Sequence, residues 1–368
     1  MKASVLTLHT VANYGTQLQA LATQEKLQHY FDYVEFIDYR RNDTYGLGLL
    51  RTFSKGNILK SLAVIPTLIR WKFIFGKFQK NHLNISRRKY LSEEDLQKFS
   101  DDADVYFSGS DQVWNSGWNG GIIPAFYLSF IPPEKPKYAF CSSFGRTKLD
   151  DKEVEDTKIF IKQFRYISVR EESGRKILMT QYGYNNCTRL VDPTLSLKAD
   201  YWRSICQKSK RIKGKYILIY NLNRSRSFDK YAKEIAKRVG LPLYRFCTRY
   251  DQIFRNGKSL IIPEIEDFIS LIDNAELVIT DSFHATAFSM NLNTEVVCVY
   301  PSTYSGRISE FLKLVKAEQR HSKNFEDFDI LQPDRRTDFH RVNQILNKER
   351  KRTEQFLLHV AEEVRSGQ

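Results

Sequence analysis

Cysteine is scarce in this sequence, and its cysteines are not spaced as metal ligands or redox pairs. There are five, an odd number, scattered without a CxxC motif: Cys141, Cys187, Cys206, Cys247 and Cys298. Neither a disulfide framework nor a cysteine-based zinc site is expected, and we expect no metal and no cofactor. A reducing compartment fits this pattern best.

Long hydrophobic runs are also missing. No segment approaches the roughly 18 apolar residues that a membrane-spanning helix needs. The apolar run at the N-terminus, Met1–Leu8, is too short for a signal peptide and predicts a first buried strand instead. We therefore expect a cytoplasmic protein.

Acidic residues are outnumbered by basic ones, 43 to 57, which gives a net charge of +14. Such a balance attracts phosphorylated metabolites, anionic lipid or nucleic acid, and it also serves solubility alone. The basic residues are spread over the chain and form no known nucleic-acid module, so no nucleic-acid partner is expected.

The composition is that of a globular protein, with 42% hydrophobic and 27% charged residues. A length of 368 residues favours two cores of ordinary size. Strand-like apolar runs alternate with helical patterns, which predicts an α/β chain with parallel sheets. One series of strands ends near Arg170, and a second begins after Asp192–Thr194.

Two α/β halves with a cleft between them follow from this organisation. We expect an N-terminal domain over residues 1–195 and a C-terminal domain over residues 196–335. The basic stretch Lys208–Lys215 is expected as a linker or exposed turn. The segment 336–368 has a charged helical pattern, and its apolar positions predict a helix that packs across the outside of the domains.

One insertion, residues 49–80, departs from the alternation. It contains seven Lys or Arg residues, no acidic residue and interleaved aromatic and aliphatic residues. This pattern is typical of a segment that meets anionic lipid headgroups, which would place the protein peripherally at the inner face of the membrane. The alternative is a pair of helices packed on the first domain with solvated lysines.

Small and polar residues follow several strands, at the edge where open α/β sheets bind ligands. Asp111 stands in such a segment, Ser108–Asn115, directly after a predicted strand. A carboxylate in this position can remove a proton from a sugar hydroxyl. The structural alternative is a plain turn in which Asp111 caps a helix.

Arg170 closes another predicted strand. Its guanidinium could clamp a carboxylate or phosphate through two parallel hydrogen bonds. It could instead form a salt bridge to Glu171 or Glu172. Because neighbouring residues on a strand point to opposite faces, Glu171 would be a poor partner if the strand continued.

His284 follows a strand and stands where a helix is expected to begin, in Thr280–Ala287. Helix N-termini bind phosphate, so His284 could donate to a phosphate or transfer a proton near neutral pH. A structural histidine is the alternative. His9 is the only other histidine at a strand end, and Tyr304–Arg307 could add a cation to the same cleft.

Taken together, these segments resemble the polysaccharide pyruvyl transferase family over nearly the whole chain. Six short motifs occur in order: Thr7–His9 with Asn13–Ala20, Gly109–Asn115, Tyr138–Ala139 with Ser142–Gly145, Ser168–Glu171, Val191–Thr194 and Thr280–His284. The resemblance implies two Rossmann-like domains facing a cleft, as in GT-B glycosyltransferases. It also implies transfer of a pyruvyl group from phosphoenolpyruvate to a sugar, forming a cyclic ketal and releasing phosphate.

The resemblance also implies roles for individual residues. Arg170 would clamp the carboxylate or phosphate, His284 would be phosphate ligand and acid, and Asp111 would be the hydroxyl base. Further substrate-binding residues would be Asn13, Tyr14, Gly15, Ser110, Gln112, Ser282, Phe283 and Arg307. Some members have Arg-Leu-His where this chain has Ser282–His284, so one cation is absent, and Arg307, Arg146 or Arg224 are candidates to replace it.

The expected acceptor is a hexose of a bacterial surface polysaccharide or its lipid-linked precursor. Two other functions remain open. A GT-B-like glycosyltransferase of capsule or exopolysaccharide synthesis would use a nucleotide sugar, but no clear acidic ribose-binding pair is present late in the second half. A noncatalytic assembly partner in capsule synthesis would keep the fold and lack activity.

Overall fold

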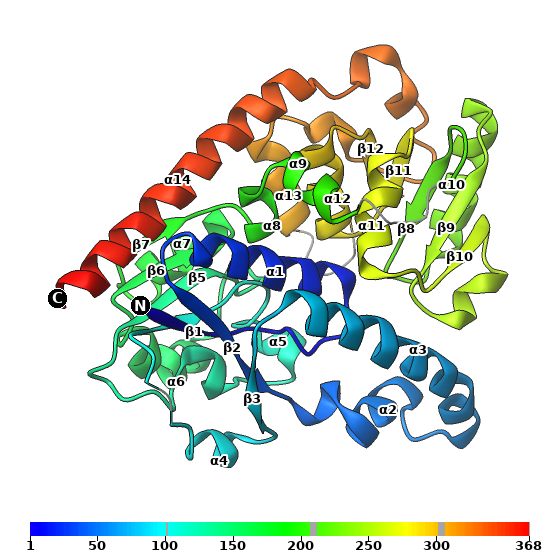
Figure 1. Ribbon diagram of the computed structural model, residues 1–368. Coiled ribbons are helices and arrows are strands. Elements are labelled where there is room, and N and C mark those ends of the chain that lie inside the picture. The colour runs from blue at the N-terminus through cyan, green and yellow to red at the C-terminus, as the bar shows by residue number, and fades with distance from the viewer. Residues whose placement is uncertain (101, 207–211, 301–305, 368) are drawn as a thin grey trace. The chain divides into compact units, whose positions relative to one another are not determined.

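The chain folds into two compact α/β units in the computed structural model (Figure 1), which describes residues 1–100, 102–206, 212–300 and 306–367. The first unit comprises residues 1–64, 75–196 and 349–368, and the second comprises residues 65–74 and 197–348. The division expected from the sequence was 1–195, 196–335 and 336–368. Part of the expected linker, residues 208–211, lies outside the described residues.

The first unit is built on a seven-stranded parallel sheet with the order β3-β2-β1-β4-β5-β6-β7. Its strands are β1 (Lys2–Leu6), β2 (Tyr33–Tyr39), β3 (Ile85–Tyr90), β4 (Val105–Ser108), β5 (Lys137–Ser142), β6 (Tyr166–Val169) and β7 (Cys187–Arg189). The direction of winding reverses between β1 and β4, where Leu6 lies opposite Ser108. Open α/β sheets bind ligands beside such a reversal, outside the carboxyl ends of the strands.

The helices of this unit are α1 (Tyr14–Gln28), α2 (Gly46–Ser54), the two ends of α3 (Ile58–His82), α4 (Glu93–Leu96), α5 (Ser116–Asn119), α6 (Asp151–Ile161), α7 (Glu172–Thr180), α8 (Pro193–Ser196) and the later part of α14 (Phe339–Ser366). α14 is the expected C-terminal helix, and its Phe356 packs against Phe140 and Tyr166 of the first unit. Short 3-10 helices occur at η1 (Asn42–Thr44), η2 (Pro124–Tyr127), η3 (Tyr250–Phe254), η4 (Glu318–Arg320), η5 (Asp329–Leu331) and η6 (Pro333–Arg335).

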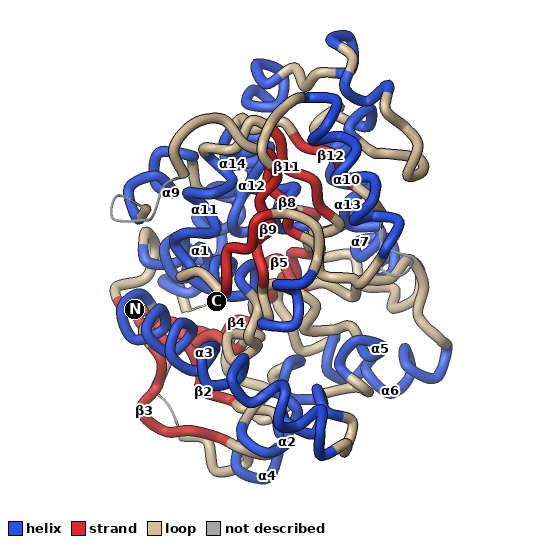
Figure 2. Tube along the Cα trace, turned by 90° about the vertical axis from the view of Figure 1, so that its right-hand side faces the viewer, coloured by secondary structure: helices blue, strands red, loops and turns tan. Residues whose placement is uncertain are grey.

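The second unit is built on a five-stranded parallel sheet with the order β10-β9-β8-β11-β12. Its strands are β8 (Ile217–Tyr220), β9 (Leu243–Cys247), β10 (Lys258–Ile261), β11 (Leu277–Thr280) and β12 (Val296–Cys298), and its helices include α9 (Ala199–Ile205), α10 (Arg226–Val239), α11 (Ile265–Asp273), α12 (Phe283–Leu292) and α13 (Gly306–Leu314). The winding reverses between β8 and β11. Figure 2 shows the strands of each sheet in red with helices beside them.

Both sheets are parallel and buried between helices, so the predicted fold of two Rossmann-like domains is confirmed. The aromatic residues lie largely in the cores. Trp114 is 1% exposed and stacks on Tyr127, and Trp202 is fully buried against Phe288 in the second unit. The high aromatic content is therefore accounted for by packing.

The insertion 49–80 forms most of α2 and α3. Residues 65–74 of α3 group with the second unit, where Trp71 Nε1 donates to Thr248 O at 2.8 Å and Arg70 pairs with Glu264 at 3.1 Å. None of the described helices combines the length and apolarity needed to cross a bilayer.

Candidate active site

Asp111 lies in the loop that follows β4, at the winding reversal of the first sheet. Its φ of 71° is a left-handed conformation, which Asp tolerates better than most residues. Thr16 Oγ1 donates to its Oδ2 at 2.8 Å, and the backbone N–H of Gln112 donates to its Oδ1 at 2.9 Å. The carboxylate is thus held in one orientation, with the whole residue 6% exposed.

The structural alternative, in which Asp111 caps a helix, is wrong. The next helix, α5, begins at Ser116, and its cap is Asn115, whose side chain accepts from Trp118 N at 3.1 Å. Asp111 instead reaches Thr16, in the first turn of α1, across the end of the sheet. Its neighbour Gly109 is required because a Cβ there would lie 2.8 Å from Thr7 Cβ.

Arg170 is buried immediately behind Asp111, with its side chain 1% exposed. Nη2 donates to Asp111 Oδ1 at 3.4 Å, Nη1 to Asp192 Oδ2 at 2.6 Å and Nε to Glu171 Oε1 at 3.1 Å. Burial alone would lower the pKa of this guanidinium, but the three carboxylates outweigh it and raise the pKa above its ordinary value.

The salt bridge to Glu171, left open by the sequence, is formed, because the strand does not continue through Arg170. β6 ends at Val169, so the strand alternation that would separate the two side chains no longer applies. Glu172 pairs with Arg175 instead, at 2.7 Å. Ser143 Oγ donates to Glu171 at 3.0 Å, so this carboxylate also has a neutral donor.

Asp192 is a member of the cluster that sequence reasoning treated only as a strand end and domain junction. Its Oδ1 accepts from the backbone N–H and the hydroxyl of Thr194, at 3.0 and 2.6 Å, while its Oδ2 binds Arg170. A buried chain of contacts therefore runs from Thr194 through Asp192 and Arg170 to Asp111. An Asp followed by Pro-Thr after a strand was the signal that could have indicated it.

The other predicted binding residues of the first unit serve mainly to hold this region in place. Asn13 caps α1 by accepting from Thr16 N, and Tyr14 is 1% exposed and packs on Phe75. Gly15 is buried in the first turn of α1. Gln112 accepts from Asn115 Nδ2 at 2.6 Å. The hydroxyl of Ser110 is buried with no hydrogen-bond partner among the described residues.

His284 is the second residue of α12, at the carboxyl end of β11 in the second unit. Ser282 caps this helix: its Oγ accepts from Ala285 N at 3.4 Å, and its carbonyl accepts from Thr286 Oγ1. His284 is 7% exposed and makes an edge contact with Phe283. A helix N-terminus at a winding reversal is a favourable place for an anion.

Asp281 connects the two strands that flank the reversal in the second sheet. Its carboxylate accepts from the backbone N–H groups of Leu222 and Asn223, at 2.7 and 3.0 Å, and from Asn223 Nδ2 at 2.9 Å. The loop after β8 is therefore fixed beside the start of α12. The sequence placed Asp281 in a motif without indicating this role.

The three candidates for the missing cation differ in their surroundings. Arg146 pairs with Glu153 and donates to Ser116 Oγ at 2.8 Å, and Arg224 pairs with Asp251. Arg307 lies over the ring of Phe283, the residue that precedes His284. Its Cζ is 5.8 Å from the ring centroid. Tyr304, from the same motif, lies outside the described residues.

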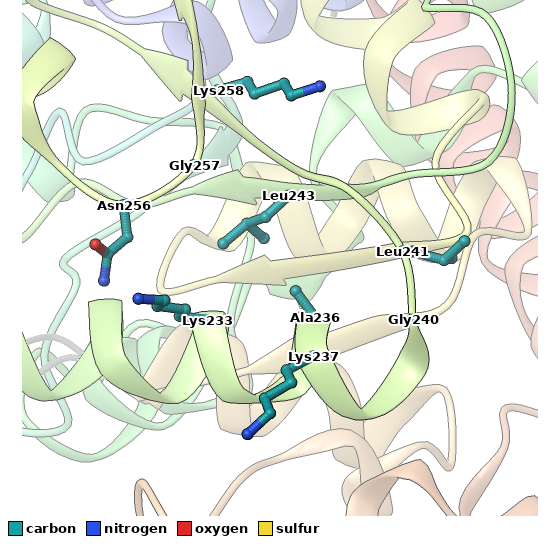
Figure 3. Close-up of a pocket in the computed structure, with 9 residues that line it drawn as sticks. All are labelled: Lys233, Ala236, Lys237, Gly240, Leu241, Leu243, Asn256, Gly257 and Lys258. Carbon is teal, nitrogen blue, oxygen red and sulfur yellow. The ribbon is translucent and has the colours of Figure 1, made fainter.

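A pocket of about 530 Å³ in the second unit lies away from these residues (Figure 3). It is lined by Lys233, Ala236, Lys237, Gly240, Leu241, Leu243, Asn256, Gly257 and Lys258. Leu243 and Lys258 are the first residues of β9 and β10, so this pocket is at the amino ends of the strands. Ligand sites of open α/β sheets are at the opposite ends.

The predicted residues thus form two groups, each within its own unit. Asp111 and Arg170 are together with Thr16 and Asp192 in the first unit. Ser282, Phe283, His284 and Arg307 belong to the second unit, and Arg307 contacts Phe283 there. Among the described residues, no group of three or more His, Cys, Asp or Glu side chains could hold a metal ion.

Solved structures with a similar fold are UDP-GlcNAc 2-epimerases. The enzyme of Neisseria meningitidis, bound to UDP-GlcNAc, gives a TM-score of 0.55 at 11% identity over 98% of this chain and 100% of that chain. The enzyme of Methanocaldococcus jannaschii gives 0.52 at 14% identity over 95% and 94%, and that of Rickettsia bellii gives 0.51 at 12% identity over 99% and 98%. At these identities the likeness shows the fold alone, which is GT-B-like.

Comparison of the sequence with protein families is more specific than the likeness of fold. No curated protein matches the chain, but the family model described as "Polysaccharide pyruvyl transferase" matches residues 13–303. The match includes Asp111, Arg170 and His284. The chain belongs to the polysaccharide pyruvyl transferase family and is a transferase.

Proposed function

We propose that the protein transfers the enolpyruvyl group of phosphoenolpyruvate to two hydroxyls of a hexose in a bacterial surface polysaccharide or its lipid-linked precursor. One hydroxyl oxygen bonds to C2 of the donor while C3 gains a proton and becomes a methyl group. The C2–O bond to phosphate then breaks, and the second hydroxyl oxygen bonds to C2. The products are a cyclic ketal and inorganic phosphate, and no oxidant or reductant is needed.

The observation that carries this proposal is the fixed carboxylate of Asp111 at the winding reversal of the first sheet. Thr16, Gln112 N–H and Arg170 orient it, and it is nearly buried. An acceptor hydroxyl within hydrogen-bond reach would lose its proton to this carboxylate as it attacks C2. We assign Asp111 as the general base.

Arg170 takes a different role from the substrate clamp that the family resemblance implied. Nε, Nη1 and Nη2 each donate to a protein carboxylate, so we assign it as the residue that positions Asp111. Its side chain is 1% exposed, which also argues against direct contact with a large acceptor.

The anionic donor is better matched by the second unit. His284 is in the first turn of α12, where backbone N–H groups and the helix dipole favour a phosphate or carboxylate. Arg307 is placed over Phe283 beside it. We assign His284 as phosphate ligand and as the acid that protonates C3, and Arg307 as the cation that replaces the family's missing arginine.

The charges of the buried networks support this division. In the first unit one arginine, Arg170, is shared by Asp111, Glu171 and Asp192. In the second unit one carboxylate, Asp229, is shared by Arg245 and Arg255, at 2.6 and 2.7 Å. A region with more carboxylates than cations suits a base and neutral hydroxyls. A region in which two arginines offset two carboxylates, Asp229 and Asp281, is the better place for a donor with two anionic groups.

The test is a single assay with two readouts. The full chain is incubated with phosphoenolpyruvate and a panel of lipid-linked or soluble oligosaccharides, and both phosphate release and product mass are measured. We expect phosphate release that depends on acceptor, together with the mass of one added pyruvate ketal. Loss of both in His284→Ala, with an unchanged melting temperature, would exclude a noncatalytic assembly partner.

Ligand-induced stabilisation separates this function from nucleotide-sugar transfer. Phosphoenolpyruvate should raise the melting temperature, and UDP and GDP should not, because only a ligand that binds the folded state stabilises it. Stabilisation by UDP or GDP alone would overturn the choice of donor.

A further inference from the structure

An exposed apolar stripe runs along α3. At about 100° per residue, positions three and four apart fall on one helix face. Five apolar residues follow this spacing and are 78%, 62%, 36%, 52% and 67% exposed: Ile58, Leu62, Ile65, Ile69 and Phe73. The opposite face is the one that packs, with Thr67, Trp71, Ile74, Phe75 and Phe78 all buried. The stripe is therefore not the helix's contribution to a core.

A short turn, Lys55–Asn57, joins α3 to α2, which is also largely exposed (Figure 1). Leu47 in the first turn of α2 is 73% exposed, and Leu59 in the first turn of α3 is 76% exposed. A row of large exposed apolar side chains such as the one on α3 marks an interaction surface, whereas single exposed ones are ordinary.

The charge of the same segment has one sign. Residues 46–80 contain no Asp or Glu and seven basic residues: Arg51, Lys55, Lys60, Arg70, Lys72, Lys77 and Lys80. Arg51, Lys55, Lys60 and Lys72 are exposed. On the helix, Lys72 is spaced to fall at the border of the apolar stripe, where a long side chain can reach headgroups while its stem stays in apolar surroundings.

We propose that α2 and the exposed face of α3 dock on a bilayer surface that contains anionic lipid. The apolar side chains would enter the boundary between headgroups and acyl chains, and the basic side chains would contact the headgroups. A second copy of this chain is a poorer occupant because it would bring the same positive charges to the contact. The inference does not rest on the proposed function, although docking would bring the protein to lipid-linked acceptors.

Vesicle flotation of the full chain tests the proposal. Vesicles of phosphatidylcholine are compared with vesicles that contain about one-third phosphatidylglycerol, a content that gives a negative surface. We expect binding to the anionic vesicles only, weakening as salt shortens the range of the attraction. The double variants Ile58→Asp/Leu62→Asp and Lys55→Glu/Lys60→Glu should each lower the partition coefficient at least about tenfold.

Matched controls come from the second unit. Phe254 is 89% exposed, more than Ile58 or Leu62, so Phe254→Asp removes an exposed apolar side chain elsewhere. Lys233→Glu/Lys237→Glu makes the same change of charge on α10. Both should bind anionic vesicles as the unaltered chain does. A similar loss in the α10 variant would show general attraction by net charge and overturn the proposal.

Two further results would also overturn it. One is an unaltered chain that binds neither kind of vesicle. The other is a dimer, detected by light scattering, that Ile58→Asp/Leu62→Asp converts to monomers without a change in vesicle binding.

Phosphate release with a soluble acceptor separates this inference from the proposed function, because the α3 variants should retain that activity. Vesicle binding in a chain without pyruvyl transfer would overturn only the proposed function.

Discussion

The two winding reversals of this molecule have the same topology and a different balance of buried charge. In the first unit, β1 and β4 end beside a network in which one buried arginine serves three carboxylates. In the second unit, β8 and β11 end beside a network in which Asp229 serves Arg245 and Arg255, and Arg245 also donates to Asn221. Burial lowers the pKa of Arg245, and its carboxylate partner does not reverse this, whereas the pKa of Arg170 is raised.

This contrast teaches that the sheet topology provides a place for a ligand, while the buried charges behind it select the kind of ligand. A parallel sheet with a winding reversal gives both units an open edge with loops. Under the proposed function, the balance of buried charge suits hydroxyl chemistry in the first unit and anion binding in the second.

The largest expected effect is on catalysis by Asp111. Asp111→Asn keeps the shape and removes the base, so kcat should fall about 10²- to 10⁴-fold in the pyruvyl-transfer assay. The matched variant in the second unit, Asp281→Asn, disturbs the loop after β8 and should mainly raise KM for phosphoenolpyruvate. Equal losses of kcat in the two variants would show that the reversals do not differ in role.

The two buried arginines should differ in their effect on stability. Arg170→Met leaves three buried carboxylates without their shared cation, which should lower the free energy of unfolding by about 3–5 kcal/mol. Arg245→Met leaves Asp229 paired with Arg255, so about 1–3 kcal/mol is expected. Chemical denaturation measures both. A larger loss for Arg245→Met would contradict the inferred difference in the balance of buried charge.

If Arg170 positions Asp111, its substitution should change kcat and leave KM for phosphoenolpyruvate unchanged. Arg170→Lys keeps one positive charge but cannot reach three carboxylates with fixed geometry. We expect kcat to fall about tenfold or more while KM for phosphoenolpyruvate stays unchanged, since one tenfold step corresponds to about 1.4 kcal/mol of barrier. A rise in KM for phosphoenolpyruvate with kcat unchanged would instead support the original clamp.

A smaller effect concerns the cap of α12. Ser282→Ala should lower the free energy of unfolding by about 1 kcal/mol, because the cap accepts from Ala285 N. Ser282→Arg would lose the same cap but add the cation that some family members have. Tighter binding of phosphoenolpyruvate by Ser282→Arg than by Ser282→Ala, measured calorimetrically, would sharpen the assignment of the second unit to the donor.

The last prediction is a pH dependence from a buried cation whose hydrogen bonds go to neutral groups. Lys137 donates to Ile131 O and Gln163 Oε1, and burial lowers its pKa from 10.5 to about 8. The unfolded chain therefore binds more protons between about pH 8 and 10.5, so this lysine makes stability rise with pH in that window. Lys137→Met should remove that rise; an unchanged pH slope would show that Lys137 is not titrating there.

The sequence by itself determined the alternation of strands and helices, the family and the strand-end positions of the site residues. Apolar runs such as Ile217–Tyr220 and Leu277–Thr280 have the length of a buried strand and are too short for a helix. Small or polar residues after such runs predict ligand-binding loops. Asp111, Arg170 and His284 could be singled out because each follows such a run.

Only the tertiary structure decided what these residues contact. Arg170 meets Asp111 and Asp192, which are 59 and 22 positions away in sequence, and no local pattern reports such distances. The end of β6 at Val169 decided that Glu171 pairs with Arg170, since a strand boundary depends on pairing with its neighbours. Burial, which is set by the whole fold, then enclosed the guanidinium of Arg170 and left one face of α3 exposed.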